Sequence, residues 1–315
     1  MSAPRIASLL ASGTEILYAL GLGDRVVAVS HECDYPAEVG QKPRVTRCHV
    51  DATANAGEID RQVRAMVSKG MPLYELDVEG LARLKPDLMV TQAQCEVCAI
   101  SYDDVLRAVA EHEGLKAARV VALNPTTLEA IWADILRVGE ASGASVQAEA
   151  VVGGLRRRVR VVEDSTGGLD DGERPRVVCL EWVDPLMPAG NWIPELIELA
   201  GGKCQFSAPG RHSDVIEWSR VVAFDPQIIV VMPCGFDLSR SLEEARSLTS
   251  LPRWADLTAA KTRQVYVVDG NAYFNRSGPR VVDSLEILAA IFHPDRFSLP
   301  PHIPGPTWQR LDLCG

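Results

Sequence analysis

The sequence predicts an α/β fold made of two similar parallel-sheet lobes that are joined by one long helix. Two observations carry this prediction: strand-like and helix-like segments alternate along the chain, and a helix-proline-strand pattern occurs twice. The two prolines are Pro86 and Pro226, which lie 140 positions apart. In each copy the proline cannot continue an amphipathic helix, and an apolar run of strand length follows it.

A second pair of segments supports the repeat. Residues 15–21 resemble residues 195–201, because each begins with Glu, continues as a short apolar helix and ends with Gly. Both pairs occur in the same order along the chain, which favours two related lobes over chance similarity. Ligands commonly bind in the cleft between two such lobes.

Residues 1–125 are expected to form the first lobe. Its apolar strands are separated by amphipathic helices, which end at glycines such as Gly21 and Gly70. Strands that alternate with helices need crossover connections, so we expect a parallel sheet. The expected elements are strands at 5–10, 25–29 and 119–123, helices at 14–20, 59–68 and 102–112, and the helix-proline-strand unit at 81–90.

Residues 126–164 are expected to be helical. Apolar side chains recur at spacings of three and four over 128–140 and again over 145–164, and Gly143 separates the two stretches. Ser145 is expected to cap the second helix. At 1.5 Å per residue that helix would be about 30 Å long, which is enough to connect two lobes.

Residues 165–299 are expected to form the second lobe. A polar, glycine-rich linker at 164–173 precedes strands at 176–181, 227–232 and 264–268, and the last helix is expected at 279–291. The proline-rich tail, residues 300–315, is expected to cover the surface without a core of its own.

The composition excludes some classes of function. The net charge of −10 at pH 7 argues against nucleic acid and anionic membranes as partners. No apolar run approaches the ~20 residues of a membrane-spanning helix, so no membrane insertion is expected. The first expected strand begins at Arg5, without a preceding signal peptide or lipid-acceptor cysteine, and the eight cysteines suit a reducing compartment. We therefore expect a cytoplasmic protein, or a periplasmic one only if a leader is missing from the sequence.

Cysteine, histidine and aromatic residues concentrate in the loops that follow the expected strands. Parallel sheets carry their binding sites at this edge, so these residues are candidates for contact with a small-molecule ligand. They are His31, Glu32, Cys33, Gln94, Cys95, Trp182, Trp192, His212, Tyr273 and Phe274. The sequence shows no Ser-His-Asp triad, catalytic carboxylate pair or phosphate-binding loop, so neither an enzyme nor a catalytic cofactor is expected.

Several of these candidates have more than one reading. Cys95 and Cys98 form a CxxC motif, which fits a dithiol of lowered pKa, a pair of metal ligands, or two unreactive thiols at a helix start. His31 and His212 are further possible metal ligands, or surface histidines. The tryptophans are either core residues or flat surfaces on which a large planar ligand stacks, and the position of Trp182 favours stacking.

Five segments resemble the cobalamin-binding subgroup of the class III periplasmic binding proteins, which serve ABC importers of cobalamin, siderophores and haem. They are residues 14–15, 34–36, 84–87, 198–202 and 273–280. The resemblance extends from Arg5 to about Asp295. It implies two α/β lobes that are joined by a rigid helix and bind the ligand between them.

The resemblance also implies roles for single residues. Exported members carry one glutamate per lobe that docks onto arginines of the permease; Glu79 matches the first, whereas Ser219 occupies the second position, with Glu217 two residues away. Docking to an ABC permease is therefore in doubt. Tyr74 lies near the position of a cleft tryptophan of the exported cobalamin binder, and Arg276 is expected to contact amide or carboxylate groups of the ligand.

We therefore expect a non-enzymatic protein that binds a corrinoid such as cobalamin, or a related metal chelate, in the cleft between its lobes. Haem and zinc are less favoured ligands. One alternative is the substrate-binding subunit of an ABC importer that lacks its signal peptide. The other is a cytosolic zinc or iron protein that holds its metal with cysteines and histidines of the cleft.

Overall fold

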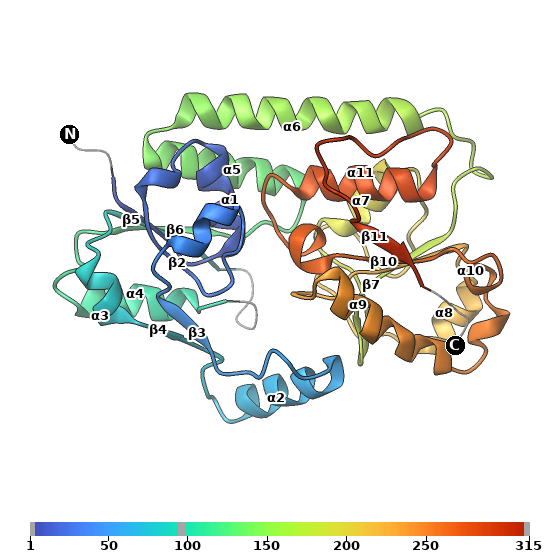
Figure 1. Cartoon of the computed structure of the whole chain (residues 1–315), viewed down its shortest axis with the longest axis horizontal. Coiled ribbons are helices and arrows are strands. Elements are labelled where there is room, and N and C mark those ends of the chain that lie inside the picture. The colour runs from blue at the N-terminus through green and yellow to red at the C-terminus, as the bar shows by residue number, and fades with distance from the viewer. Residues whose placement is uncertain (1–3, 94–98, 312–315) are drawn as a thin grey trace.

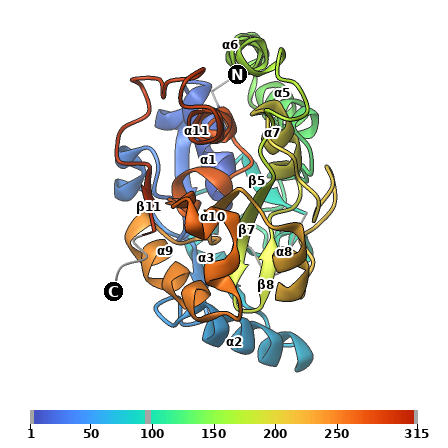
Figure 2. The same cartoon turned by 90° about the vertical axis from the view of Figure 1, so that its right-hand side faces the viewer.

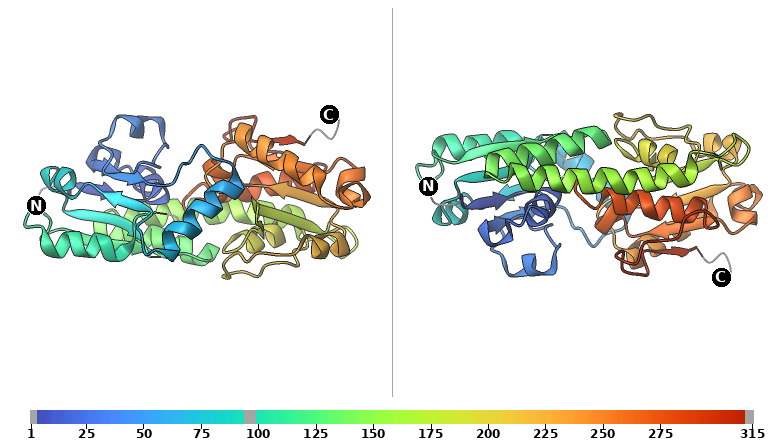
Figure 3. Two further views of the ribbon diagram at one scale, coloured as in Figure 1. Left: turned by 90° about the horizontal axis from the view of Figure 1, so that it is seen from below. Right: turned by 90° about the horizontal axis from the view of Figure 1, so that it is seen from above.

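Two α/β lobes lie side by side, and one long helix, α6 (Ser145–Thr166), runs over both of them (Figure 1). The computed structural model describes residues 4–93 and 99–311. Seen from above, α6 extends along both lobes (Figure 3). The predicted fold class is confirmed by this arrangement.

The first lobe contains a four-stranded parallel sheet in the order β2-β1-β5-β6. Its strands are β1 (Ile6–Ser8), β2 (Val26–Val29), β5 (Leu88–Gln92) and β6 (Arg119–Leu123). Helices α1 (Ala11–Ala19), α3 (Val78–Arg83), α4 (Tyr102–Glu111) and α5 (Leu128–Ser142) accompany this sheet. Since β5 is buried at every position and apolar from Leu88 to Val90, it forms the centre of the lobe's core.

The first lobe also carries an excursion that we call the arm, residues 46–76. It consists of a two-stranded antiparallel ribbon, β3 (Thr46–Cys48) and β4 (Tyr74–Leu76), and of helix α2 (Ala56–Ser68) between them. In the view from below, α2 lies across the junction of the two lobes (Figure 3).

The second lobe contains a five-stranded sheet in the order β11-β10-β9-β7-β8. The three inner strands, β7 (Val177–Val183), β9 (Ile228–Val231) and β10 (Val265–Val268), are parallel, whereas β8 (Leu186–Pro188) and β11 (Trp308–Arg310) are antiparallel edges. The tail prediction was wrong on this point, because β11 belongs to the sheet and Leu311 is only 5% exposed. The helices of this lobe are α7 (Ile193–Leu199), α8 (Trp218–Phe224), α9 (Leu238–Ala245), α10 (Thr258–Lys261) and α11 (Val281–Phe292).

Helix α6 (Ser145–Thr166) contains 22 residues, which makes it about 33 Å long. Its capping residue is Ala144, whose side chain makes no cap, so the prediction of a Ser145 cap was wrong. Helix α6 packs against α5 on one side and α11 on the other. The Arg158 side chain pairs with Asp283 and Glu286 of α11, at 2.6 Å for Glu286, and so ties the helix to the second lobe. No helix among the described residues is both long and apolar enough to cross a membrane.

The predicted repeat is confirmed by matching backbone geometry. Lys85 and Asp225, which precede the two prolines, both adopt left-handed conformations, with φ of 46° and 47°. Each lobe also makes the same pair of arginine contacts. Arg5 donates its backbone N–H to Asp87 and its Nε–H to the Leu84 carbonyl, at 2.7 and 3.0 Å. Arg176 donates the equivalent bonds to Gln227 and Phe224, at 3.1 Å each.

Candidate ligand-binding site between the lobes

Loops at the carboxyl ends of strands from the two lobes meet at the lobe junction. The loop after β2 carries Asp34, and a π-helical turn after β10, Gly270–Phe274, carries Asn271. The Asn271 amide donates to the Asp34 carboxylate at 2.8 Å. Because both sheets direct this edge toward the same junction, the candidate site lies between the lobes, as in other open α/β sheets.

Arg276 closes the junction and has no free donor. Its guanidinium is 5% exposed. Its Nη1 pairs with Asp34 at 2.7 Å and with Glu15 at 3.3 Å, and its Nη2 donates to Asp34 and Asn271 at 2.9 and 2.8 Å. Its Nε donates to the Asn271 carbonyl at 2.7 Å. These five contacts use all five guanidinium hydrogens. The prediction that Arg276 contacts the ligand was therefore wrong: this side chain holds the two lobes together.

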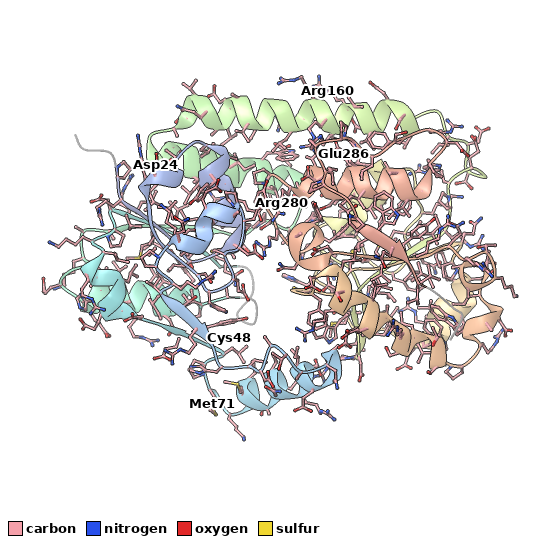
Figure 4. All side chains as sticks on the ribbon, in the orientation of Figure 1. Asp24, Cys48, Met71, Arg160, Arg280 and Glu286 are labelled. Carbon is pink, nitrogen blue, oxygen red and sulfur yellow. The ribbon has the colours of Figure 1, made fainter. Side chains whose placement is uncertain are left out.

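Arg280 makes a second connection to the same glutamate. Its Nη2 and Nε donate to the two carboxylate oxygens of Glu15, at 2.6 and 2.9 Å. The guanidinium lies 3.9 Å above the Tyr35 ring and 5.5 Å from the Tyr273 ring. Figure 4 labels Arg280 at the junction of the lobes. Tyr273 is 6% exposed and packs on this arginine, so its predicted role as a stacking surface for the ligand was wrong.

Three partly exposed side chains of the first lobe, His31, Glu32 and Tyr74, are candidates for ligand contact at the junction. The His31 ring accepts or donates a hydrogen bond at Thr46, with Nδ1 2.7 Å from the hydroxyl, and lies 5.6 Å from the Tyr74 ring. Burial, together with the nearby Arg44, lowers the pKa of His31, so the imidazole is neutral at pH 7. Neutral imidazole is the form that binds metals.

Glu32 lies beside His31 and has an unusual environment. Its side chain is 41% exposed, and its Oε1 is 3.9 Å from His31 Nε2. Burial nevertheless raises the pKa of Glu32 to about 7, although Arg276 opposes the shift. Desolvation disfavours the ionised carboxylate, so Glu32 holds its proton to a higher pH than a carboxyl in water.

The second lobe contributes Trp182 and Glu181 at the end of β7. The half-buried Trp182 ring lies 5.3 Å from Phe236 and is tilted against it by 53°. Burial raises the pKa of Glu181, and the nearby His212 partly offsets that shift. The His212 side chain is exposed. The structure thus places an accessible aromatic ring, a desolvated carboxyl and an imidazole at this edge of the second lobe.

Three predicted contact residues lie in the hydrophobic core instead. Cys33 is 0% exposed, receives a hydrogen bond from Thr14 at 3.0 Å, and has its pKa raised to about 11 by burial. Phe274 is 1% exposed and Trp192 is 7% exposed, and both pack in the core that joins the lobes. These predictions were wrong because loop residues can point into the core as readily as outward. Gln94, Cys95 and Cys98 lie outside the described residues.

The described residues contain one group that could hold a metal ion, and it differs from the predicted metal ligands. Within residues 4–93 and 99–311, the one group with three potential ligand atoms within 4.8 Å of one another is Asp283, Glu286 and His302. Arg158 already pairs with both carboxylates, so this group is a salt-bridge network between α6, α11 and the tail. Neither His31 nor His212 belongs to it.

The two predicted docking glutamates differ in their surroundings. The Glu79 side chain on α3 is 76% exposed, and its Oε1 lies 3.3 Å from His112 Nε2. Glu217 is exposed at the residue that precedes α8. Ser219 is the second residue of α8, as Glu79 is of α3, which supports the alignment of these positions.

Two hollows of the surface are each lined by residues of one lobe. The first has a volume of about 440 Å³ and lies near the amino ends of the second-lobe strands, where Arg176 and Phe224 line it. The other, of about 380 Å³, lies between α4 and the arm and includes Tyr74 and His112. Neither contains residues of both lobes, although Tyr74, which lies beside His31, lines the second of them.

The comparisons with known proteins agree with this architecture. Residues 6–272 match the family model described as periplasmic binding protein. An ABC transporter substrate-binding lipoprotein of Bacillus subtilis is 25% identical over 300 residues, covering 93% of this chain and 81% of its own. A vitamin B12-binding protein of Vibrio cholerae is 23% identical over 292 residues, covering 90% and 87%. A periplasmic haem-binding protein of Pseudomonas aeruginosa has a similar structure, with a TM-score of 0.71, 21% identity and 98% of each chain covered.

Proposed function

Because the chain belongs to the periplasmic binding protein family of ABC-importer substrate-binding proteins, we propose that it binds a corrinoid or a related metal chelate between its lobes. The observation that carries the proposal is the junction itself. An accessible aromatic ring on each lobe, Tyr74 and Trp182, lies near the strand ends, and the neutral imidazole of His31 accompanies Tyr74.

This set of groups suits a flat ligand with a central metal. Aromatic faces stack on planar macrocycles, and an imidazole can coordinate the metal or donate a hydrogen bond to the ligand's polar edge. Relatives are named for vitamin B12, a corrinoid, and for haem, a porphyrin. Corrinoids are the preferred class, because several curated relatives share the vitamin B12 name.

The test is a titration with cyanocobalamin, hydroxocobalamin and haemin, followed by visible absorbance and calorimetry. We expect a sub-micromolar Kd for a cobalamin, about −8 kcal/mol or better. Trp182→Ala should weaken binding by ~1–3 kcal/mol through lost stacking. His31→Ala should change the bound spectrum if its imidazole coordinates the metal. Phe274→Leu serves as a control, since this ring lies in the core.

A metal-site protein is the competing function. Absence of binding to any of the three ligands, together with stoichiometric zinc or iron in purified protein, would reject the corrinoid proposal and favour a site built on Cys95 and Cys98. Metal analysis of the Cys95→Ser and Cys98→Ser variants would then locate that site.

We also propose a cytoplasmic location and weak docking to a permease. Four of the described cysteines, Cys33, Cys48, Cys179 and Cys204, are free thiols, which suits a reducing compartment. The exposed Glu79 has no charged counterpart at Ser219, so a permease that offers one arginine to each lobe would lose one ion pair. Fractionation of native cells tests the location, and recovery of the protein from the periplasm would contradict it. Co-purification tests the docking, and a tight complex with a permease would contradict it.

A further inference from the structure

The arm is an addition to one lobe that the common lobe plan does not need. The end of the first helix and the repeated proline are equivalent landmarks in the two lobes. They are 65 positions apart in the first lobe, from Gly21 to Pro86, and 25 positions apart in the second, from Gly201 to Pro226. The second lobe connects the same two landmarks with 40 fewer residues, and this connection contains α8 but, among its described residues, no strand. Strand β2 accounts for a small part of the surplus and the arm, residues 46–76, for most of it.

The arm is attached to the other lobe by polar contacts at the start of α2. Arg240 of α9 donates hydrogen bonds to the carbonyl oxygens of Ala52 and Ala54. The Ala56 N–H donates to the Glu244 carboxylate at 3.2 Å. The arm contributes only backbone groups to these hydrogen bonds, two carbonyl oxygens and one N–H. The contact with α9 therefore depends on the backbone conformation of this segment more than on its side chains.

Close packing accompanies the hydrogen bonds. Ala56 is 0% exposed and belongs to a core cluster that is otherwise made of second-lobe residues, against which Ile59 also packs. A Cβ on Gly57 would lie 2.4 Å from a carboxylate oxygen of Asp184, so a larger residue fits here only if that side chain moves or is shortened. The first turn of α2 is therefore seated on the second lobe with little space to spare.

The rest of the arm is weakly held. In α2 only Ala56 is buried, and Val67 and Met71 beyond it are 55% and 51% exposed. The connecting ribbon of β3 and β4 consists of three residue pairs. The arm is held to the second lobe only near the start of α2 and to its own lobe by a short ribbon, so it can detach at a low cost in free energy. Helix α6, in contrast, is packed along its length.

The attachment point adjoins the candidate ligand site. The Arg240 guanidinium lies 3.6 Å above the Phe236 ring, and Phe236 contacts Trp182 at 5.3 Å. Helices α2 and α6 lie on opposite sides of the molecule, as Figures 1 and 2 show. The two lobes are thus bridged twice: by the strut α6 on one side and by the arm on the other.

We propose that the arm is a gate, which spans the lobe junction opposite α6 and must leave the second lobe before a large ligand can enter or leave. This inference rests on the proposed binding of a ligand between the lobes. The strut keeps the lobes in place, and the gate alone moves.

Two variants test the gate from opposite directions, with cyanocobalamin as the probe in stopped-flow absorbance. Arg240→Ala with Glu244→Ala removes the polar attachment and should raise both the association and the dissociation rate at least threefold. Gly57→Cys with Asp184→Cys, oxidised with glutathione disulfide, should lower both rates at least tenfold, and dithiothreitol should restore them. Glu243→Ala, an exposed neighbour on α9, is the matched control and should change neither rate. Equal rates in the oxidised and reduced forms would overturn the gate.

A measurement without ligand separates failure of the gate from failure of the proposed function. Amide hydrogen exchange of the unmodified protein should show α2 exchanging at least about 100-fold faster than β7 and β9. The Arg240→Ala, Glu244→Ala variant should accelerate exchange in the arm and leave the two sheets unchanged. If α2 exchanges as slowly as the strands, the arm is a fixed wall and the gate is rejected, whether or not cobalamin binds.

Discussion

The first helices of the two lobes, α1 and α7, carry glutamates at equivalent positions that reach toward the opposite half of the molecule. Glu15 is 3% exposed and pairs with Arg276 and Arg280 of the second lobe. Glu195 is half-buried and accepts one hydrogen bond, at 2.7 Å, from the Leu128 N–H at the start of α5. Equal positions in a repeat therefore carry unequal energetic weight, because one carboxylate is a buried ion-pair partner and the other caps a helix start.

The largest expected effect comes from this pair. Glu15→Gln should lower the free energy of unfolding by about 3 kcal/mol, because it leaves buried guanidinium groups without their shared carboxylate. Glu195→Gln should cost about 1 kcal/mol, since an amide oxygen can still accept the Leu128 hydrogen bond. Urea unfolding of both variants checks this difference. Equal losses would show that the two glutamates are equivalent in energy as well as in position.

The left-handed residues before the prolines give a smaller contrast. Asp225 accepts hydrogen bonds from the Thr258 N–H and hydroxyl, at 2.8 and 2.7 Å. Lys85 has the same φ value without such contacts among the described residues. Lys85→Gly should be near neutral, since relief of left-handed strain offsets the greater freedom of the unfolded chain. Asp225→Gly should lose ~1 kcal/mol through the missing hydrogen bonds. Thermal unfolding of the pair would refute this if Lys85→Gly proved the more destabilising.

The smallest effect is the pH dependence from Glu32. Its pKa in the folded protein is about 7, above the ordinary value of 4.5, so the folded state binds the proton more tightly than the unfolded state. The stability that this proton supplies is present below about pH 4.5 and is lost as the pH rises to about 7. Relative to the unmodified protein, Glu32→Gln should therefore be more stable at pH 8, where the Glu32 carboxyl is ionised, than at pH 4.5. Because the side chain is 41% exposed, we expect less than about 1 kcal/mol.

Melting temperatures at the two pH values measure this slope, with Glu79→Gln as an exposed control. Glu181→Gln should act in the same direction in the second lobe, because burial also raises the pKa of that carboxyl. A slope of opposite sign for both variants would mean that the junction does not desolvate its acids.

Local signals explain why much of the fold was predictable. Apolar periodicity placed the strut at 145–164, against Ser145–Thr166 in the structure, and the strand at 119–123 has the predicted bounds. The helix-proline-strand repeat is also local, since proline acts on its own helix. Strand β11 was missed, because three residues are too few for an alternating pattern and its partner, β10, lies about 40 positions earlier.

The site was less predictable, because it depends on contacts between distant segments. Trp182 and Trp192 looked alike in the sequence, yet one is half-buried and the other lies in the core. Arg276 finds Glu15 across 261 positions, and no periodic signal connects them. The seating of α2 on the opposite lobe likewise depends on the shape of a surface that a one-dimensional pattern does not describe.

The pairing of Glu15 with Arg276 also sets an order of events during synthesis. All four strands of the first sheet have been made by residue 123, but the arginines that neutralise Glu15 follow more than 250 positions after it. At ~5–20 residues per second, this delay is roughly 13–50 s. During that interval the nascent first lobe has to keep the Glu15 carboxylate in contact with water. Final burial of α1 at the lobe junction therefore becomes possible only after Arg276 and Arg280 have been made.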